Sequence, residues 1–235
     1  MKEYTVAITG NPNTGKTSIF NSLAHQNQKV GNWPGVTVEK KDGILFQDNT
    51  KRIKIIDLPG IYSLRSASED EIIASDFIIK NNPSMTVVVL DASRLERSLY
   101  LFMQIRELGQ KTVVILNMVD IAKTNGISID AVELSKLLGC PVVETVANNN
   151  VNMDVLKEII MNTLETGQKI ISTRFRVSVS EAISNIEKSI DISGSTSKNY
   201  LAIKIAENDN YYTESLLKNE RLLAIIQQEN EKIAK

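Results

Sequence analysis

The chain has 235 residues, enough for one well-buried core of ordinary domain size and a smaller appendage. Its content of 42% hydrophobic and 23% charged residues is typical of soluble globular proteins and excludes a disordered chain. The formal net charge of −1 provides no electrostatic footprint for nucleic acid, and the single cysteine excludes an internal disulfide and favours a reducing compartment.

The N-terminal sequence MKEYTVAITG contains one short apolar strand and lacks the long apolar region of a signal peptide. No stretch of the chain approaches the roughly 20 apolar residues that a membrane helix requires. We therefore expect this chain to be soluble and intracellular.

Strand-like and helix-like segments alternate through the first two-thirds of the chain. Apolar or β-branched runs predict buried strands at residues 4–9, 53–57, 86–91, 112–117 and 142–146. Helical spacing of apolar residues predicts helices at 16–24, 70–80, 95–108, 130–138 and 151–164. This alternation is typical of an α/β fold with a mostly parallel sheet covered by helices. The run at 38–46 faces 51–57 across a short turn, which predicts a hairpin and one antiparallel edge strand.

The pattern changes after about Thr173, where strand-like segments end. Helical spacing then predicts two amphipathic helices, marked by Val179, Ile183, Ile186 and Ile190 and by Leu222, Ile225, Ile226 and Ile233. The SGSTS stretch at 193–197 is expected to be a loop between helices. We therefore expect two domains, an α/β domain over residues 1–168 and a small all-helical domain over residues 169–235.

The first strand is followed by GNPNTGKT, which matches the phosphate-binding loop (P-loop) pattern GxxxxGK[ST]. Glycines allow backbone N–H groups to wrap a β-phosphate, the Lys16 amine reaches the β- and γ-phosphates, and the Thr17 hydroxyl is a ligand for Mg²⁺. The next residues open a helix, whose N-terminal dipole favours phosphate. An accidental glycine-rich turn is the alternative, and the strand–loop–helix order disfavours it. The expected nucleotide-binding residues here are Gly10, Asn11, Pro12, Asn13, Thr14, Gly15, Lys16, Thr17 and Ser18.

A second motif, DLPG, runs from Asp57 to Gly60 at the end of a strand. Asp57 is placed to hold Mg²⁺ through water, and the Gly60 amide can donate to the γ-phosphate. The pattern DxxG is weak alone, because turns use Asp and Gly freely. One hairpin after a P-loop, it predicts a loop that responds to hydrolysis.

A third motif, NMVD, runs from Asn117 to Asp120 and ends another strand. The Asp120 carboxylate can accept hydrogen bonds from N1–H and the exocyclic amine of guanine, whereas adenine presents the opposite donor pattern, so GTP is preferred over ATP. Met118 stands where NKxD motifs have lysine, which predicts looser nucleotide binding. The alternative is a loop in which Asn and Asp cap the next turn.

The order of these motifs resembles that of the Ras-like GTPases over residues 1 to about 165. The resemblance implies that Thr37 contributes its hydroxyl to Mg²⁺ and its amide to the γ-phosphate, with Gly35 and Val36 beside the nucleotide. It also implies that a last base-contacting loop follows the strand at 142–146. That loop reads Val146, Ala147 and Asn148, where the superfamily often has Ser-Ala-Lys.

The sequences GNPNTGKT, NWPGVTVEKK, DLPGIYSL and NMVD together resemble the ferrous iron transporter B (FeoB) family, whose cytosolic N-terminal part is a G domain followed by a helical domain. Ile61 follows DxxG where Ras-type enzymes have a water-orienting glutamine, and an isoleucine can neither donate nor accept a hydrogen bond. Some GTPases of this kind use a potassium ion instead. By resemblance that ion would be held by Asn13 and the backbone carbonyls of Gly31 and Trp33.

Trp33 is the only tryptophan, and it lies among loop-forming residues. We expect its ring to shield the potassium site or the nucleotide from water. Packing of the loop, with no catalytic role for the ring, is the alternative.

The leading hypothesis is slow, potassium-stimulated GTP hydrolysis in the cytosolic switch domain of a ferrous iron transporter. GTP or GDP, Mg²⁺ and K⁺ are the expected cofactors, with Thr17, Thr37 and Asp57 for Mg²⁺. The residues expected to act in hydrolysis are Asn13, Lys16, Thr37 and Gly60. A nucleotide sensor whose output is binding is a variant of this hypothesis.

The FeoB resemblance also implies partners. We expect a transmembrane iron-permease domain after Lys235 in the full-length protein, which would place this chain at the cytoplasmic face of the cell membrane. Small Feo accessory proteins and further copies of the chain are candidate partners. No nucleic-acid partner is expected.

The rival hypothesis is a soluble GTPase that binds RNA in ribosome assembly or tRNA modification. Such proteins usually carry a basic appendage, and the segment after Thr173 has near-balanced charge. His25 and Cys140 are single residues far apart and are interpreted as surface or core residues rather than iron ligands. The acidic residues 69–71 are interpreted as caps of the following helix.

Overall fold

The computed structural model describes residues 1–24, 28–64, 68–166, 168, 176–190, 197–207 and 209. The chain divides into two compact units, one of Met1–Arg106 with Gln110–Ile171 and the other of Glu107–Gly109 with Ser172–Lys235. His25, most of the loop predicted at 193–197 and the amphipathic segment predicted around 222–233 lie outside the described residues.

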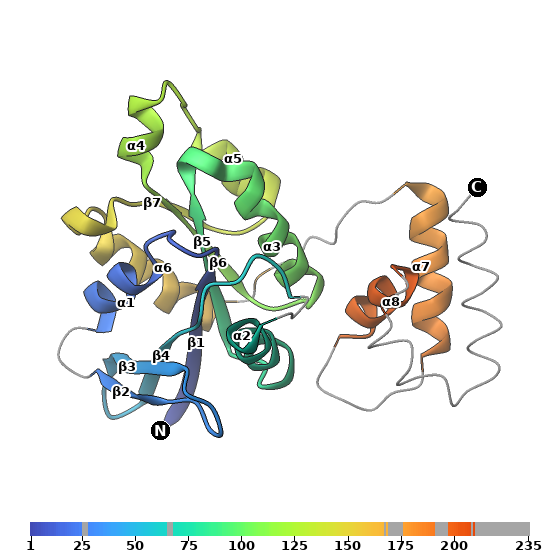
Figure 1. Cartoon of the computed structure of the whole chain (residues 1–235), viewed down its shortest axis with the longest axis horizontal. Coiled ribbons are helices and arrows are strands. Elements are labelled where there is room, and N and C mark those ends of the chain that lie inside the picture. Colours follow the sequence, from blue (N-terminus) through green and yellow to red (C-terminus); the bar gives the residue numbers. More distant parts are fainter. Residues whose placement is uncertain are drawn as a thin grey trace. The chain divides into compact units, whose positions relative to one another are not determined.

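Unit 1 is built on a sheet of seven strands in the order β2-β3-β4-β1-β5-β6-β7 (Figure 1). The neighbours from β4 to β7 pair in parallel, whereas β3 is antiparallel to both β2 and β4. The strands are β1 (Lys2–Gly10), β2 (Lys29–Asn32), β3 (Glu39–Gln47), β4 (Lys51–Asp57), β5 (Met85–Asp91), β6 (Thr112–Asn117) and β7 (Val142–Glu144). The predicted α/β fold with a mostly parallel sheet and an antiparallel hairpin is therefore confirmed.

One strand was missed by the sequence-based prediction. Residues 29–32, expected to be loop, form β2 and lie outside β3 at the edge of the sheet. All four residues of β2 are exposed, so no alternation of apolar and polar side chains marks the strand. It is paired with β3 through a ladder from Lys29 opposite Asp42 to Asn32 opposite Glu39.

Helices cover both faces of this sheet, with α1 and α6 on one side and α2 and α3 on the other (Figure 1). The helices of unit 1 are α1 (Lys16–Ala24), α2 (Glu69–Lys80), α3 (Leu95–Glu107), α4 (Val119–Thr124), α5 (Ala131–Leu138) and α6 (Met153–Glu165), with short 3₁₀ turns η1 (Ala92–Arg94) and η2 (Ala147–Asn149). The central strands read as near-continuous apolar runs because both of their faces are buried, as the successive residues Val87 and Val88 of β5 and Val113 and Val114 of β6 show.

The acidic residues at the start of α2 act as predicted. The Ser68 hydroxyl accepts a hydrogen bond from the Glu71 amide, and the Glu71 carboxylate accepts one from the Ser68 amide, both at 3.3 Å. This capping box satisfies two amides that the helix itself cannot pair, and the acidic first turn complements the helix dipole.

The described part of unit 2 contains α7 (Val177–Ser189) and α8 (Lys198–Ala206). The helix predicted from Val179 to Ile190 is confirmed by α7, whereas α8 was not predicted. Ile183, Ile186, Leu201 and Ile205 form a small apolar core of their own. In the parts of the chain that the structure describes, none of the helices has the length and apolar character to span a membrane.

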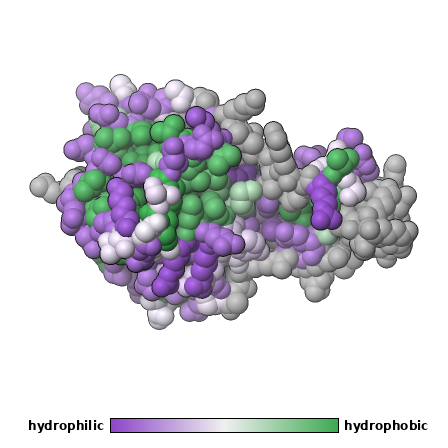
Figure 2. Space-filling view, turned by 90° about the horizontal axis from the view of Figure 1, so that it is seen from above, coloured by the Kyte–Doolittle hydropathy of each residue, from purple (hydrophilic) through white to green (hydrophobic). Residues whose placement is uncertain are grey.

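The side of unit 1 that carries α4 is seen face-on in Figure 2. Hydrophobic residues gather in the middle of this face inside a rim of hydrophilic ones. Exposed apolar side chains on α4 and α5 include Ile121, Val132 and Leu137.

Candidate functional site

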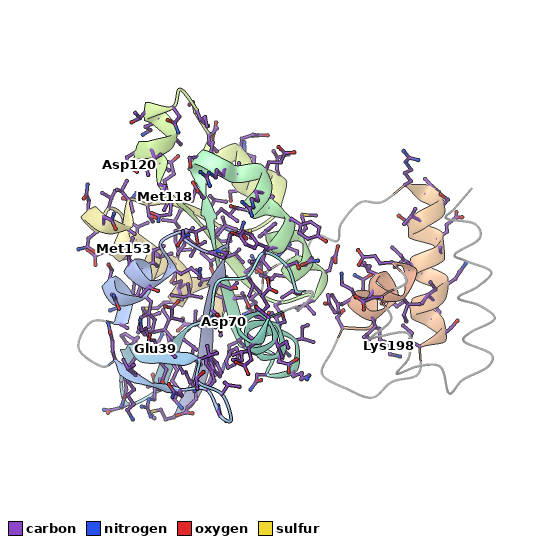
Figure 3. All side chains as sticks on the ribbon, in the orientation of Figure 1. Glu39, Asp70, Met118, Asp120, Met153 and Lys198 are labelled. Atoms are coloured by element: carbon purple, nitrogen blue, oxygen red, sulfur yellow. The ribbon has the colours of Figure 1, made fainter. Side chains whose placement is uncertain are left out.

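The predicted motifs follow the carboxyl ends of β1, β4 and β6, which all run in the same direction in the parallel part of the sheet and therefore end at one edge of it. This edge is where α/β proteins of this type bind their ligands. Figure 3 shows Met118 and Asp120 at the start of α4, beyond the end of β6. Tertiary structure thus gathers at one edge three motifs that are far apart in the sequence.

The P-loop joins β1 to α1 and depends on residues without a Cβ. Gly10 and Gly15 have φ values of 152° and 87°. A Cβ on Gly10 would lie 2.4 Å from the carbonyl oxygen of Val89, and one on Gly15 would lie 2.4 Å from the Asn117 amide nitrogen. Any side chain at either position would displace its neighbours, so the loop can keep this shape only with glycine.

Lys16 is buried beneath the loop. Its ammonium donates a hydrogen bond to the Asn11 carbonyl at 2.8 Å. Burial lowers the pKa of Lys16 from 10.5 to about 8, although the nearby Asp57 carboxylate raises it in part. A Cβ on Gly60 would lie 2.8 Å from the Lys16 ammonium and 2.9 Å from the Cα of Pro12, so Gly60 comes as close to the P-loop as a residue can.

Thr17 at the start of α1 and Asp57 at the end of β4 are joined by a hydrogen bond. The Thr17 hydroxyl donates to one carboxylate oxygen of Asp57 at 2.8 Å. The other oxygen, Oδ1, is buried and has no hydrogen-bond partner in the described part of the chain. Burial raises the pKa of Asp57, against the opposing effects of the Thr17 hydrogen bond and the Lys16 charge. An orphaned carboxylate oxygen beside a hydroxyl is a donor set that suits a hard cation such as Mg²⁺.

Asn117 joins three loops through its side-chain amide. The amide nitrogen donates to the Thr14 carbonyl at 2.9 Å, and the amide oxygen accepts from the Thr145 hydroxyl and the Ala147 backbone N–H, each at 3.0 Å. Thr145 was not among the predicted site residues. The sequence feature that could have identified Thr145 is a polar residue within an apolar strand-like run, since a buried polar side chain needs a hydrogen-bond partner. Thr145 is fully buried.

The residues predicted to contact the base lie around this amide. Met118 has left-handed backbone (φ 61°), and Asp120 is exposed at the start of α4. Val146 precedes η2, Ala147 is buried in it, and Asn148 is exposed. The structure therefore brings the NMVD motif and the last predicted loop together through Asn117.

The 3₁₀ turn η2 is also held from α1. The Ser22 hydroxyl of α1 donates to the side-chain oxygen of Asn150 at 2.5 Å. Asn150 has left-handed backbone (φ 53°) and ends the turn. These residues, like Thr145, were not predicted from the sequence.

The loop with Thr37 makes no hydrogen bond to the Thr17–Asp57 pair within the described part of the chain. Thr37 itself is exposed. The Trp33 carbonyl accepts from the Val36 amide at 3.3 Å in a turn where Gly35 has a φ of 81°. Asn13 is exposed with left-handed backbone (φ 64°), and no described contact connects it to the loop.

The Trp33 ring packs within unit 1. It makes an edge-on contact with Phe77 of α2, with ring centres 5.5 Å apart, and the Lys40 ammonium lies 5.0 Å from its centre. The side chain is 9% exposed, and its indole N–H is buried without an acceptor among the described residues. This arrangement is the packing that the loop-packing alternative expects.

The residue after DLPG, Ile61, has no polar side-chain group that could orient a water molecule. Ile61 is fully buried, and its amide donates to the Gly10 carbonyl at 3.2 Å. Next to it, Tyr62 stacks with the Arg97 guanidinium at 4.2 Å, and the Leu64 amide donates to the buried Gln104 side chain at 2.7 Å. The segment after Gly60 is thus fastened to β1 and α3.

Cys140 has the surroundings of a core residue. It is buried, and burial raises the pKa of its thiol to about 11, with the Arg106 charge acting in the opposite direction. At neutral pH this thiol is protonated and a weak nucleophile.

Comparison with known proteins identifies relatives of the whole chain. The family description "Ferrous iron transport protein B" matches residues 4–160. Over 223 residues the chain is 42% identical to "Fe(2+) transporter FeoB" of Legionella pneumophila (strain Lens). The aligned region covers 89% of this chain and 29% of the relative. The chain therefore spans less than a third of the length of the curated relative that it matches.

Solved structures agree with this assignment. The chain is similar to the cytosolic domain of the T. maritima FeoB iron transporter in GDP form I, with a TM-score of 0.84, 34% identity and coverage of 100% of this chain and 96% of that one. It is also similar to the GMPPNP form of that domain, with a TM-score of 0.82, 34% identity and coverage of 98% and 96%. The chain belongs to the ferrous iron transport protein B (FeoB) family.

Proposed function

We propose that this chain binds GTP and GDP and hydrolyses GTP slowly, as the nucleotide switch of a ferrous iron transporter. The observation that carries the proposal is the buried Lys16 ammonium beside the Thr17–Asp57 pair, under a loop whose glycines exclude side chains. The T. maritima relative was solved with GDP and with GMPPNP, and the Legionella relative bears the name of an Fe(2+) transporter. Family membership favours this function over that of an RNA-associated GTPase.

Each side chain has a task that its chemistry allows. Lys16 would bind the β- and γ-phosphates, Thr17 and Asp57 would hold Mg²⁺, and the Gly60 amide would donate to the γ-phosphate. Mg²⁺ would neutralise phosphate charge that develops during hydrolysis. Thr37 would have to move toward this centre, because its loop packs elsewhere in this structure.

Specificity for guanine is assigned to Asp120. Its carboxylate can accept from both N–H groups of the guanine edge, whereas an asparagine there would offer a donor that suits the carbonyl of xanthine. In Asp120→Asn we expect GDP affinity to fall on the order of a hundredfold and xanthosine diphosphate to bind instead. Titration with fluorescent nucleotides measures both affinities.

Asp154→Asn is the matched control for this experiment, because Asp154 is an exposed carboxylate in the first turn of α6. It should bind GDP like the unmodified chain. Unchanged GDP affinity in Asp120→Asn, or the same loss in the control, would refute the assignment of Asp120.

The proposal that potassium stimulates hydrolysis depends on two residues: Asn13, which would bind the ion, and Ile61, which has no group to orient the attacking water. Asn13 is exposed in the P-loop, and the Trp33 carbonyl, although it accepts from Val36, retains a lone pair for a cation. Bound potassium would supply positive charge near the phosphates. We expect faster hydrolysis in potassium than in sodium buffer, and loss of that difference in Asn13→Ala.

The control for the potassium experiment is GDP binding, which Asn13→Ala should leave intact if its side chain serves the cation alone. Equal rates in the two salts, or a potassium effect that survives in Asn13→Ala, would remove potassium from the proposal without affecting nucleotide binding.

The whole protein is proposed to be longer than this chain. Since the chain covers 29% of the Legionella relative, we propose that the remainder carries the transmembrane iron permease and that this part lies at the cytoplasmic face of the membrane. Small Feo accessory proteins and further copies of the chain are proposed partners. Residues 1–168 and 169–235 are proposed as separate domains.

A further inference from the structure

A groove of about 1280 Å³ lies on unit 1 away from the P-loop. Its described lining comes mainly from β2 to β4, the end of α2 and the loop after it, with Thr5 of β1 and Lys157 of α6. It includes none of the residues of the P-loop, the DLPG motif or the NMVD motif. Figure 1 shows β2 and β3 at the outer edge of the sheet, beside β4. The groove exceeds the volume of most small-molecule pockets, which favours a polypeptide segment as its occupant.

The charge of the groove is one-sided. Its described lining contains one carboxylate, Asp42, and five cationic side chains: Lys29, Lys40, Arg52 and Lys54 from β2 to β4, and Lys157 from α6, which covers the other face of the sheet. From beside the groove, Glu3 pairs with Arg52 at 3.8 Å and with Lys54 at 3.5 Å. These pairs are long and half-exposed, so they contribute little and can be exchanged for a stronger partner.

Two further features indicate an amphipathic ligand. Ile44, Ile56 and Phe77 give the groove an apolar part. The Arg52 Nε is buried and has no acceptor among the residues the structure describes. A ligand that fits would place carboxylates on the cations and apolar side chains on the isoleucines and Phe77.

We propose that this groove docks an acidic, amphipathic segment of a partner protein. A concave site with cations on several elements suits an extended or helical segment better than a flat membrane surface, which could not reach its apolar part. The binding itself does not depend on the proposed nucleotide function.

The groove is connected to the loop that carries Thr37. Lys40 and Phe77 both line the groove and both contact the Trp33 ring. A segment that engages Lys40 or shifts Phe77 must change the packing of Trp33, four residues before Thr37. Occupancy of the groove is therefore coupled to the position of this loop, and this coupling, unlike the binding, rests on the proposed function.

The test uses a synthetic peptide of alternating glutamate and leucine pairs, with a glutamine-for-glutamate peptide as its matched control. Titration calorimetry measures binding to the whole chain. Emission of Trp33, the only tryptophan, reports on Lys40 and Phe77 of the groove, which its ring contacts. We expect the acidic peptide alone to bind, to lose affinity as salt rises and to shift the emission.

Lys54→Glu and Lys54→Gln identify the site. We expect Lys54→Glu to weaken the acidic peptide about tenfold and Lys54→Gln to weaken it less. Lys136→Glu, on the exposed face of α5, makes the same change in net charge and should bind the peptide normally. Unfolding curves and GDP titration of each variant check that the domain remains intact.

Four results would overturn the proposal. These are no binding of the acidic peptide, an equal loss in Lys136→Glu, Lys54-dependent binding of phosphatidylserine vesicles in place of the peptide, and Lys54-dependent self-association in sedimentation. If the unmodified chain does not bind GDP, the proposed function is overturned, but the peptide result still stands. Failure of the proposed function and failure of the docking proposal are therefore distinguishable.

Discussion

Lys16 is a residue at which the proposed phosphate binding and the stability of the fold conflict. Its folded-state pKa of about 8 lies below the value of 10.5 for an exposed lysine, so the unfolded chain binds more protons between these two pH values. The stability penalty is therefore fully present below about pH 8, on the order of 3 kcal/mol, and is relieved as pH rises toward 10.5. A bound phosphate would supply the missing negative charge.

This reasoning predicts a stabilising substitution. In the nucleotide-free protein, Lys16→Met should raise the free energy of unfolding at pH 7, and the gain should shrink as pH approaches 10. The same variant should lose GDP binding. Urea unfolding at several pH values measures the first effect and nucleotide titration the second.

Lys136→Met, an exposed lysine on α5, is the control and should change neither property. A Lys16→Met protein that is less stable than the unmodified chain at pH 7 would contradict the burial penalty assigned to the amine.

At the scale of elements, the Asn117 amide fastens the end of β6 to the P-loop and to the segment after β7. Replacement of Thr145 by valine keeps the shape but removes one donor to the amide oxygen. We expect Thr145→Val to lose about 1 kcal/mol of stability and to release GDP faster, because the loop after β7, which is proposed to contact the base, is held to Asn117 by fewer hydrogen bonds.

Thr145→Ser keeps the hydroxyl, so it should release GDP as slowly as the unmodified chain, even though the missing methyl group weakens packing around residue 145. Stopped-flow displacement of a fluorescent GDP measures the release rate. Equal release rates in the valine and serine variants would show that the hydroxyl does not position Asn117.

At the scale of the molecule, the two units have separate cores. The core of unit 1 lies between Val6 and Leu164, whereas the described core of unit 2 lies between Val179 and Ala206, and the two share no residue. The end of unit 1 is fastened by Gln168, whose side chain bonds both the N–H and the carbonyl of Thr112, and by Lys111, which donates to the carbonyls of Leu164 and Thr166.

A chain of residues 1–168 should therefore fold and bind GDP with the affinity of the longer chain. A chain that ends at residue 162 lacks these attachments and the last turn of α6, and should be less stable by more than about 2 kcal/mol, since Leu164 is buried. Circular dichroism with thermal unfolding and GDP titration distinguishes the two. A 1–168 chain that fails to fold would show that unit 1 depends on the helices after it.

The sequence by itself determined the α/β fold, the order of the motifs and the glycine-dependent shape of the P-loop. Each of these can be read from residues close together in the sequence: the apolar runs of the strands, the glycines of GNPNTGKT and the carboxylate of Asp57 at the end of β4. Only the tertiary structure decided the burial of Trp33 against Phe77, the strand β2, the role of Thr145 and the basic groove. These features arise from contacts between residues distant in sequence, and no local pattern of hydrophobicity or turn residues encodes such pairings.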